Sequence, residues 1–218
     1  MANQEHLDIL AKGIEPWNAW REQYPNVRPD LSNASLPSAV LRGMNLKHAD
    51  AAGADFSAAR LTSADLTGAR VTGATLIEAD LRMARLKGAD LTRARLIAAD
   101  LGGADLKNAD LSDADLSGAY LRGTRMERTS LTGARLRGTT FAEVDLRGVI
   151  GLESVRHDGP SSIGLDTIYR SQGKIPESFL RGAGVPESFV TFMRSLAGVA
   201  LEFYSVFISQ TPPAERVA

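Results

Sequence analysis

A period of five residues runs through the middle of the chain. From Leu31 to Leu146 every fifth residue is apolar, which makes 24 positions with no insertion between them, and 19 of these are Leu. We call these 24 positions the central residues. An amphipathic helix needs an apolar spacing of about 3.6 residues and a half-buried strand one of about 2, so neither element alone explains the period.

Repetition at a short, fixed period predicts a solenoid, in which each coil buries its apolar residues against the next coil. The residue types agree with this interpretation. Leu fills an interior, the Ala two positions before most central residues lets neighbouring backbones approach closely, and recurrent glycines such as Gly68 and Gly73 suit tight corners. A hydrophobic core therefore accounts for all apolar residues of the repeat.

Runs such as Ala104-Asp105-Leu106-Lys107-Asn108 and Ala114-Asp115-Leu116-Ser117-Gly118 resemble the pentapeptide-repeat family. The resemblance implies an all-β solenoid, a right-handed quadrilateral parallel β-helix with one pentapeptide on each side. The 24 central residues would then form about six coils, and residues 20 positions apart would stack. One interior column would contain Leu36, Phe56, Leu76, Leu96, Leu116 and Leu136.

The repeat divides the chain into three parts: residues 1–30, the β-helix at 31–150, and residues 151–218. Residues 4–24 predict helix, because apolar residues recur there at steps of three and four. Pro16 predicts a break near Gly13 or a second helix that begins at Pro16. We expect this segment to cover the first coil, since a terminal coil exposes core and strand edge. The alternative is that its tryptophans, Trp17 and Trp20, form a binding platform.

After Gly151 the period stops, and a small helical segment is expected to cap the far end. A short helix is predicted over Ser162–Ser171. Two further helices should start at Pro176 and Pro186, each with Pro at the first position and Glu next to it, where an acid suits the helix dipole.

Residues 160–182 are similar to the connector that joins pentapeptide repeats to a toll/interleukin-receptor (TIR) domain in bacterial proteins. There the connector leads into a strand resembling Phe203-Tyr204-Ser205-Val206-Phe207-Ile208-Ser209. The TIR domain with its catalytic Glu is missing from this sequence. We therefore expect neither the signalling nor the NAD-cleaving activity of that class.

Charge is almost balanced, with 25 basic and 26 acidic residues in the chain and 16 and 14 over residues 31–150. Some pentapeptide-repeat proteins mimic DNA on type II topoisomerases. Such mimicry needs a surface dominated by carboxylates, because duplex DNA carries one charge per ~1.7 Å. Here one predicted column mixes both signs: Asn45, Asp65, Arg85, Asp105, Arg125 and Asp145. The sequence favours neither this mimicry nor binding of nucleic acid.

Nothing in the sequence indicates an enzyme, a cofactor or a metal site. The chain has no Cys, and its histidines, His6, His48 and His157, are scattered. An acidic cluster at residues 100–115 would place its carboxylates on successive faces of the rod, so these side chains would point in different directions. We see no secretory signal and no apolar run long enough to span a membrane, and we expect a cytoplasmic protein.

These observations predict a non-enzymatic scaffold that binds another protein. Two alternatives stay open: a protein that binds and protects a topoisomerase (DNA gyrase), and the sensor arm of a TIR-type signalling protein that lacks its effector domain. Because the apolar strand at 203–209 has no neighbouring strand, we also hypothesise a homodimer built through residues 186–209. The predicted partner or dimer contacts are Phe189, Phe192, Met193, Phe203, Tyr204 and Phe207.

Overall fold

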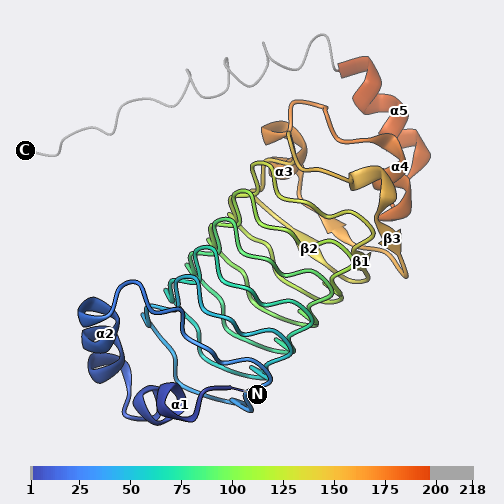
Figure 1. Ribbon diagram of the computed structural model, residues 1–218. Coiled ribbons are helices and arrows are strands. Elements are labelled where there is room, and N and C mark those ends of the chain that lie inside the picture. Colours follow the sequence, from blue (N-terminus) through green and yellow to red (C-terminus); the bar gives the residue numbers. More distant parts are fainter. Residues whose placement is uncertain (1, 197–218) are drawn as a thin grey trace, which may run out of the picture.

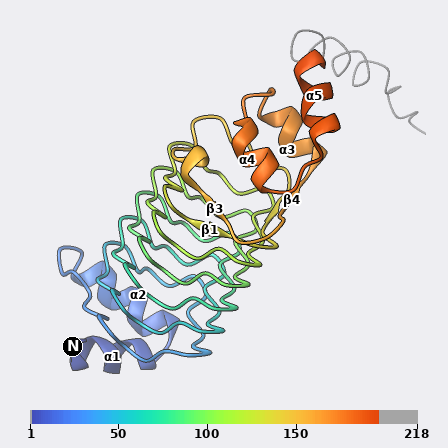
Figure 2. The ribbon, with the colours of Figure 1, turned by 90° about the vertical axis from the view of Figure 1, so that its right-hand side faces the viewer.

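The computed structural model describes residues 2–196, and the chain winds into a rod of stacked coils (Figures 1 and 2). Isolated parallel bridges join residues 20 positions apart, from Asp30↔Asp50 to Ser130↔Ile150. Twenty residues are four pentapeptides, so each coil has four sides with one pentapeptide on each. Along most of the rod each side has a single bridged residue and so forms no longer strand. Within residues 2–196, strands of two residues occur only from Arg135 onward.

Most pentapeptides close with a β-turn that follows the central residue. After Leu61, for example, the N–H of Ala64 donates to the carbonyl of Leu61 at 3.0 Å, and the turn residue Ser63 has a φ of +58°. The corresponding residue has positive φ in all 24 pentapeptides. Glycine adopts this conformation without a steric penalty, which explains the recurrent Gly at positions such as Gly73 (φ +64°).

The Asp of the repeat also serves the turn. In the pentapeptide around Leu111, Asp110 accepts a hydrogen bond from the N–H of Ser112 at 2.9 Å. Eleven Asp side chains make this contact with the N–H two residues further on. The carboxylate thus satisfies a backbone donor that the coil leaves unpaired.

The core is the inside of the rod. Of the 24 central residues, 23 are buried, while Leu36 in the first coil is only half-buried. Leu36 still packs against the core, but its side of the first coil lies at the open end of the rod, whereas Leu31 and Leu41 of the same coil are buried. Towards the other end, Thr replaces the interior Ala, and its hydroxyl finds a backbone acceptor. Thr129, for instance, donates to the carbonyl of Leu106 at 2.7 Å.

Two helices lie at the N-terminal end of the rod, α1 (Gln4–Ala11) and α2 (Ile14–Gln23) (Figure 1). They are separated by Gly13, whose φ is +99°. The break thus falls where the sequence placed it, but α2 begins two residues before Pro16. Pro16 lies in the first turn, where a missing N–H costs nothing. Trp17 is fully buried, so it packs against the core, whereas Trp20 is half-buried.

The last coil departs from the 20-residue spacing. β1 (Arg135–Leu136) pairs in parallel with β3 (Arg156–His157), and β2 (Thr140–Phe141) with β4 (Ser162–Ile163). The partners are 21 and 22 residues apart, and the 3₁₀ turn η1 (Leu152–Ser154) lies between them in the chain. Thus Ser162 starts a strand and not the predicted helix.

Three helices follow at the far end of the rod: α3 (Leu165–Arg170), α4 (Glu177–Gly182) and α5 (Glu187–Leu196) (Figure 2). The helix predicted over Ser162–Ser171 therefore begins only at Leu165. The helices α4 and α5 begin at Glu177 and Glu187, one residue after the predicted starts at Pro176 and Pro186, and Pro176 is the N-cap of α4.

Candidate protein-binding surface

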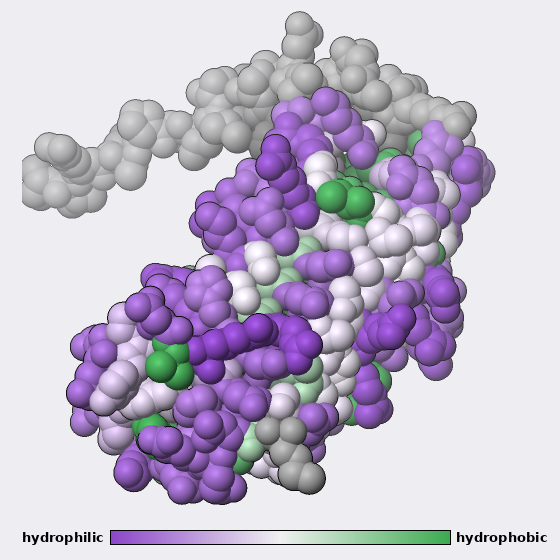
Figure 3. Space-filling model, in the orientation of Figure 1, coloured by the Kyte–Doolittle hydropathy of each residue, from purple (hydrophilic) through white to green (hydrophobic). Residues whose placement is uncertain are grey.

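The stacked coils arrange surface charges in columns, and at several positions neighbouring coils pair opposite signs, although Asp80 and Asp90 stack on Asp100 and Asp110. Arg70 contacts Asp50 at 2.6 Å, one coil away. In the column predicted to have mixed sign, Arg85 lies 3.4 Å from Asp65 and Arg125 lies 3.6 Å from Asp105. The face shown in Figure 3 is mainly hydrophilic or neutral, with only scattered hydrophobic side chains. No broad apolar patch is visible among the described residues in this view.

A shallow groove of about 750 Å³ follows one corner of the rod. We call it the corner groove. It crosses several coils, because its residues recur at intervals of 20 in the chain. It is lined by Arg42, Thr62, Arg82, Met83, Asp100, Gly102, Gly103, Tyr120, Arg122, Gly123 and Glu143.

The corner groove combines exposed apolar side chains with small residues. Tyr120 is 55 % exposed and Met83 is 63 % exposed. Gly103 lies directly beneath Met83, since a Cβ on Gly103 would come within 2.5 Å of the Met83 sulfur. A Cβ on Gly123 would meet nothing within 4 Å, so the groove is open at this residue. Gly103 thus makes room for Met83.

Arginines at the corner groove are held in place by ion pairs. Arg82 donates to both carboxylate oxygens of Asp80 at 2.8 Å and lies 3.7 Å from Asp100. Hydrogen bonding to Arg82 keeps the pKa of Asp80 well below its usual range. Arg122 is paired with Glu143 at 2.7 Å. The guanidinium groups therefore have fixed positions on either side of Gly102.

Sequence reasoning did not find the corner groove, because its residues meet only when coils stack in a known register. Two signals were present in the sequence. Tyr120 occupies a position where most pentapeptides carry Asp or Arg, and Gly102-Gly103 is the only pair of adjacent glycines within the repeat. Exposed Tyr, Met and Arg are residue types enriched at protein interfaces. The arrangement therefore has the residue types of a binding surface.

The predicted partner or dimer contacts lie at the C-terminal end of the chain, and the structure describes the side chain of only one of them. Phe189 lies in α5 and is half-buried. Phe192 and Met193 belong to the same helix, but their side chains fall outside the described set. Phe203, Tyr204 and Phe207 lie outside the described residues altogether. The homodimer and the TIR connector therefore remain predictions.

Residues 2–196 contain neither a clustered set of metal ligands nor a membrane-spanning helix. No group of three or more His, Asp or Glu side chains in this range is placed to hold a metal ion. No helix in this range is long and apolar enough to cross a membrane. The acidic cluster at residues 100–115 is explained by the turns, because Asp100, Asp105, Asp110 and Asp115 each accept a backbone N–H.

A family model for pentapeptide repeats matches this chain in eight copies, over residues 30–62, 54–93, 89–128 and 109–148. The chain belongs to the pentapeptide-repeat family. Proteins of this family form right-handed quadrilateral β-helices, in agreement with the four-sided coils described above. The matched residues span more than half of the chain and end before the helices α3 to α5.

Solved structures of pentapeptide-repeat proteins are similar to this chain. Rfr23 from the cyanobacterium Cyanothece 51142 is 25 % identical with a TM-score of 0.50, over 62 % of this chain and 97 % of Rfr23. HetL from Nostoc sp. strain PCC 7120, involved in heterocyst differentiation regulation, is 27 % identical with a TM-score of 0.31, over 62 % and 77 %. QnrB1, a plasmid-mediated fluoroquinolone resistance protein, is 16 % identical with a TM-score of 0.38, over 62 % and 79 %. A comparison with curated proteins gives no match.

Proposed function

We propose that this pentapeptide-repeat protein is a non-enzymatic scaffold that binds another protein through the corner groove. The observation that carries the proposal is the exposure of Tyr120 and Met83 between the ion-paired Arg82 and Arg122. Two large side chains are available for burial, and each neighbouring arginine is already paired with a carboxylate. A partner would therefore gain contact area while little further side-chain entropy is lost.

The proposal also covers the rod as a whole. A rod of about six coils, capped at each end by helices, offers a stiff surface on which exposed side chains keep fixed spacings. The interior is closed by Leu and Ala, so a ligand has no access to it. The carboxylates of the repeat are engaged with turn N–H groups. Hydrogen bonds from Ser57, for example, lower the pKa of Asp55, which makes it a weak base.

Affinity capture with matched variants tests the proposal. Tyr120→Ser removes the exposed ring from the corner groove, and Tyr169→Ser removes a ring of similar exposure (46 %) from α3. A central interface tyrosine contributes about 2 kcal/mol, so Tyr120→Ser should weaken binding of the captured partner about 30-fold. Tyr169→Ser should leave that affinity unchanged. Binding that resists Tyr120→Ser, while both variants melt like the wild type, would place the partner elsewhere.

A further inference from the structure

The first coil of the rod is covered on only two of its four sides. On the side of Asp30, the Asp30 N–H donates to His6 Nδ1 at 2.9 Å, and the Asp30 carbonyl accepts from the N–H of Asn3 at 3.1 Å. On the side of Asn45, the N–H donates to Asn18 Oδ1 at 2.8 Å, and the carbonyl accepts from Trp17 Nε1 at 2.9 Å. The segment 3–18 thus replaces a missing coil on these two sides.

The other two sides carry Ser35 and Val40, whose backbone N–H and carbonyl groups have no hydrogen-bond partner within residues 2–196. One coil higher, the equivalent groups of Asp55 are both paired with the first coil, through Ala34 and Leu36. Ser35 and Val40 therefore form an open parallel β-edge that faces away from the rod. Such an edge is a template for an added strand.

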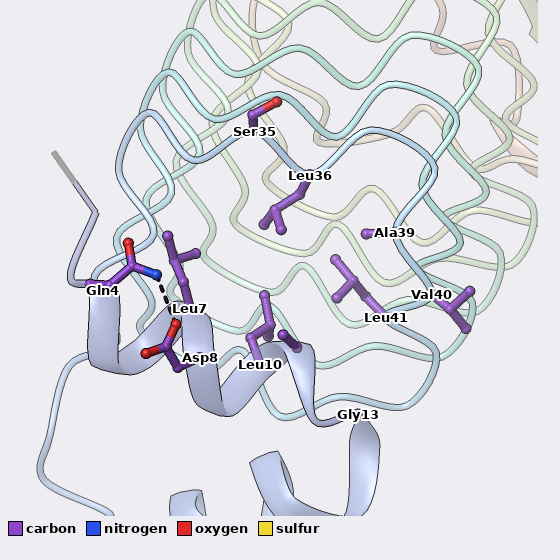
Figure 4. Close-up of a pocket in the computed structure, with 11 residues that line it drawn as sticks. Gln4, Leu7, Asp8, Leu10, Gly13, Ser35, Leu36, Ala39, Val40 and Leu41 are labelled. Carbon is purple, nitrogen blue, oxygen red and sulfur yellow. Dashed lines mark hydrogen bonds between the residues drawn. The ribbon is translucent and has the colours of Figure 1, made fainter.

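A cleft of about 510 Å³ lies beside this edge, between α1 and the first coil (Figure 4). Leu7 and Leu10 from α1 and Leu36 and Leu41 from the coil line it, and Figure 4 shows their side chains turned towards the same space. Val40 is 62 % exposed at the rim. A strand added to the edge would place an apolar side chain in the cleft and bury Leu36.

We propose that residues 203–209 of a second copy of this chain occupy the edge and the cleft. Five of these seven residues are apolar with high β-propensity: Phe203, Tyr204, Val206, Phe207 and Ile208. Pro212 and Pro213 follow shortly after and cannot donate to a ladder, so the added strand would end there. The segment therefore has the composition and the length of one strand.

The length of the chain decides between the same copy and a second one. The six residues 197–202 that separate α5 from the segment span at most about 21 Å. From Ser35 to Arg135 the rod advances five coils, or about 24 Å at the spacing of paired strands, and α5 lies beyond the last coil (Figures 1 and 2). The tail thus fails to reach its own first coil. Two antiparallel rods that exchange tails satisfy both edges and form a closed two-fold dimer.

Sedimentation equilibrium of the full-length chain tests this dimer, and its outcome does not depend on the corner groove. Val40→Pro removes an N–H that has no partner in the described structure, and Val206→Pro interrupts the added strand. Each substitution should raise the dimer dissociation constant at least tenfold. Val40→Ala keeps the N–H and should dimerise like the wild type. Val40→Lys blocks the edge without a change in the backbone, and it repeats the test if Val40→Pro fails to fold.

Mixing the two Pro variants gives the sharpest result. The Val40→Pro chain keeps a working tail and the Val206→Pro chain keeps a working edge, so a heterodimer has one intact contact while either homodimer has none. The mixture should therefore associate more tightly than each variant alone. A monomeric wild type, a mixture that stays monomeric, or a Val40→Pro chain that dimerises like the wild type would each overturn the proposal. The last result would indicate pairing of the two tails with each other.

Discussion

At the scale of residues, the recurrent Asp and the interior Thr of the rod bind the backbone beside them. Asp110 accepts the N–H of Ser112, and Thr129 donates to the carbonyl of Leu106. His157 on β3 is different. Its ring packs edge-on against Phe179 with 5.2 Å between centroids, and neither ring nitrogen has a partner within residues 2–196. Burial lowers the pKa of His157 below its ordinary value.

The lowered pKa makes the stability of the C-terminal region depend on pH. The unfolded chain takes up a proton on His157 near pH 6.5, whereas the folded chain does so only at lower pH. The contribution of His157 to the free energy of unfolding should therefore not change with pH above about pH 6.5, and it should fall as the pH decreases from there to the pKa of His157 in the folded chain. We expect a lower melting temperature at about pH 5 than at about pH 7.5 by differential scanning calorimetry.

His157→Phe should remove this part of the pH dependence, because it keeps an aromatic ring against Phe179 and has no proton to gain. His48→Phe is the matched control, since His48 is exposed. If His157→Phe and the wild type lose the same stability between the two pH values, His157 is not the group responsible.

At the scale of elements, the repeating unit is a coil that is stable only where it is stacked. Leu36 and Leu96 belong to the same interior column, but Leu36 is half-buried and Leu96 is 0 % exposed. Leu96→Asp would bury an unpaired carboxyl group and should destabilise the rod by at least about 3 kcal/mol. At the open end the carboxyl can reach water, so Leu36→Asp should cost about 1 kcal/mol.

Urea denaturation of both variants measures the difference in the free energy of unfolding. The pair is matched in residue type, in substitution and in position within the coil, so only the stacking of the neighbouring coils differs. Equal losses would mean that the two positions are equally enclosed, contrary to the structure.

Position within the rod also marks the limit of what the sequence could predict. The five-residue period located the core and the turns, because spacing alone determines which residue of each unit faces inward. Leu36 is incompletely covered because α1 and α2 extend over only part of the first coil. A local sequence pattern does not predict how far a helix extends across a coil. The corner groove depends on Gly103 in one coil making room for Met83 in the previous one. The spacings of 21 and 22 residues in the last coil are defined by the pairing of β1 with β3 and of β2 with β4, which the sequence period does not predict.

At the scale of the whole molecule, two columns of the rod cancel charge between neighbouring coils. Arg70 neutralises Asp50 one coil away, and Arg85 and Arg125 alternate with Asp65 and Asp105 along another column. Duplex DNA instead presents one negative charge per ~1.7 Å without interruption. A rod with paired charges therefore provides no extended negative field to guide a protein that binds DNA.

This cancellation predicts that the protein does not protect DNA gyrase. Purified protein should fail to restore supercoiling in the presence of a fluoroquinolone, even in stoichiometric excess. The variant Arg85→Asp/Arg125→Asp turns the mixed column into an unbroken acidic one, because Asp65, Asp105 and Asp145 already lie on it. If charge is what the wild type lacks, this variant should compete with DNA for gyrase while the wild type does not. Dose-dependent rescue by the wild type would show that a column of alternating charge is sufficient, and that the shape of the rod matters more to gyrase than its field.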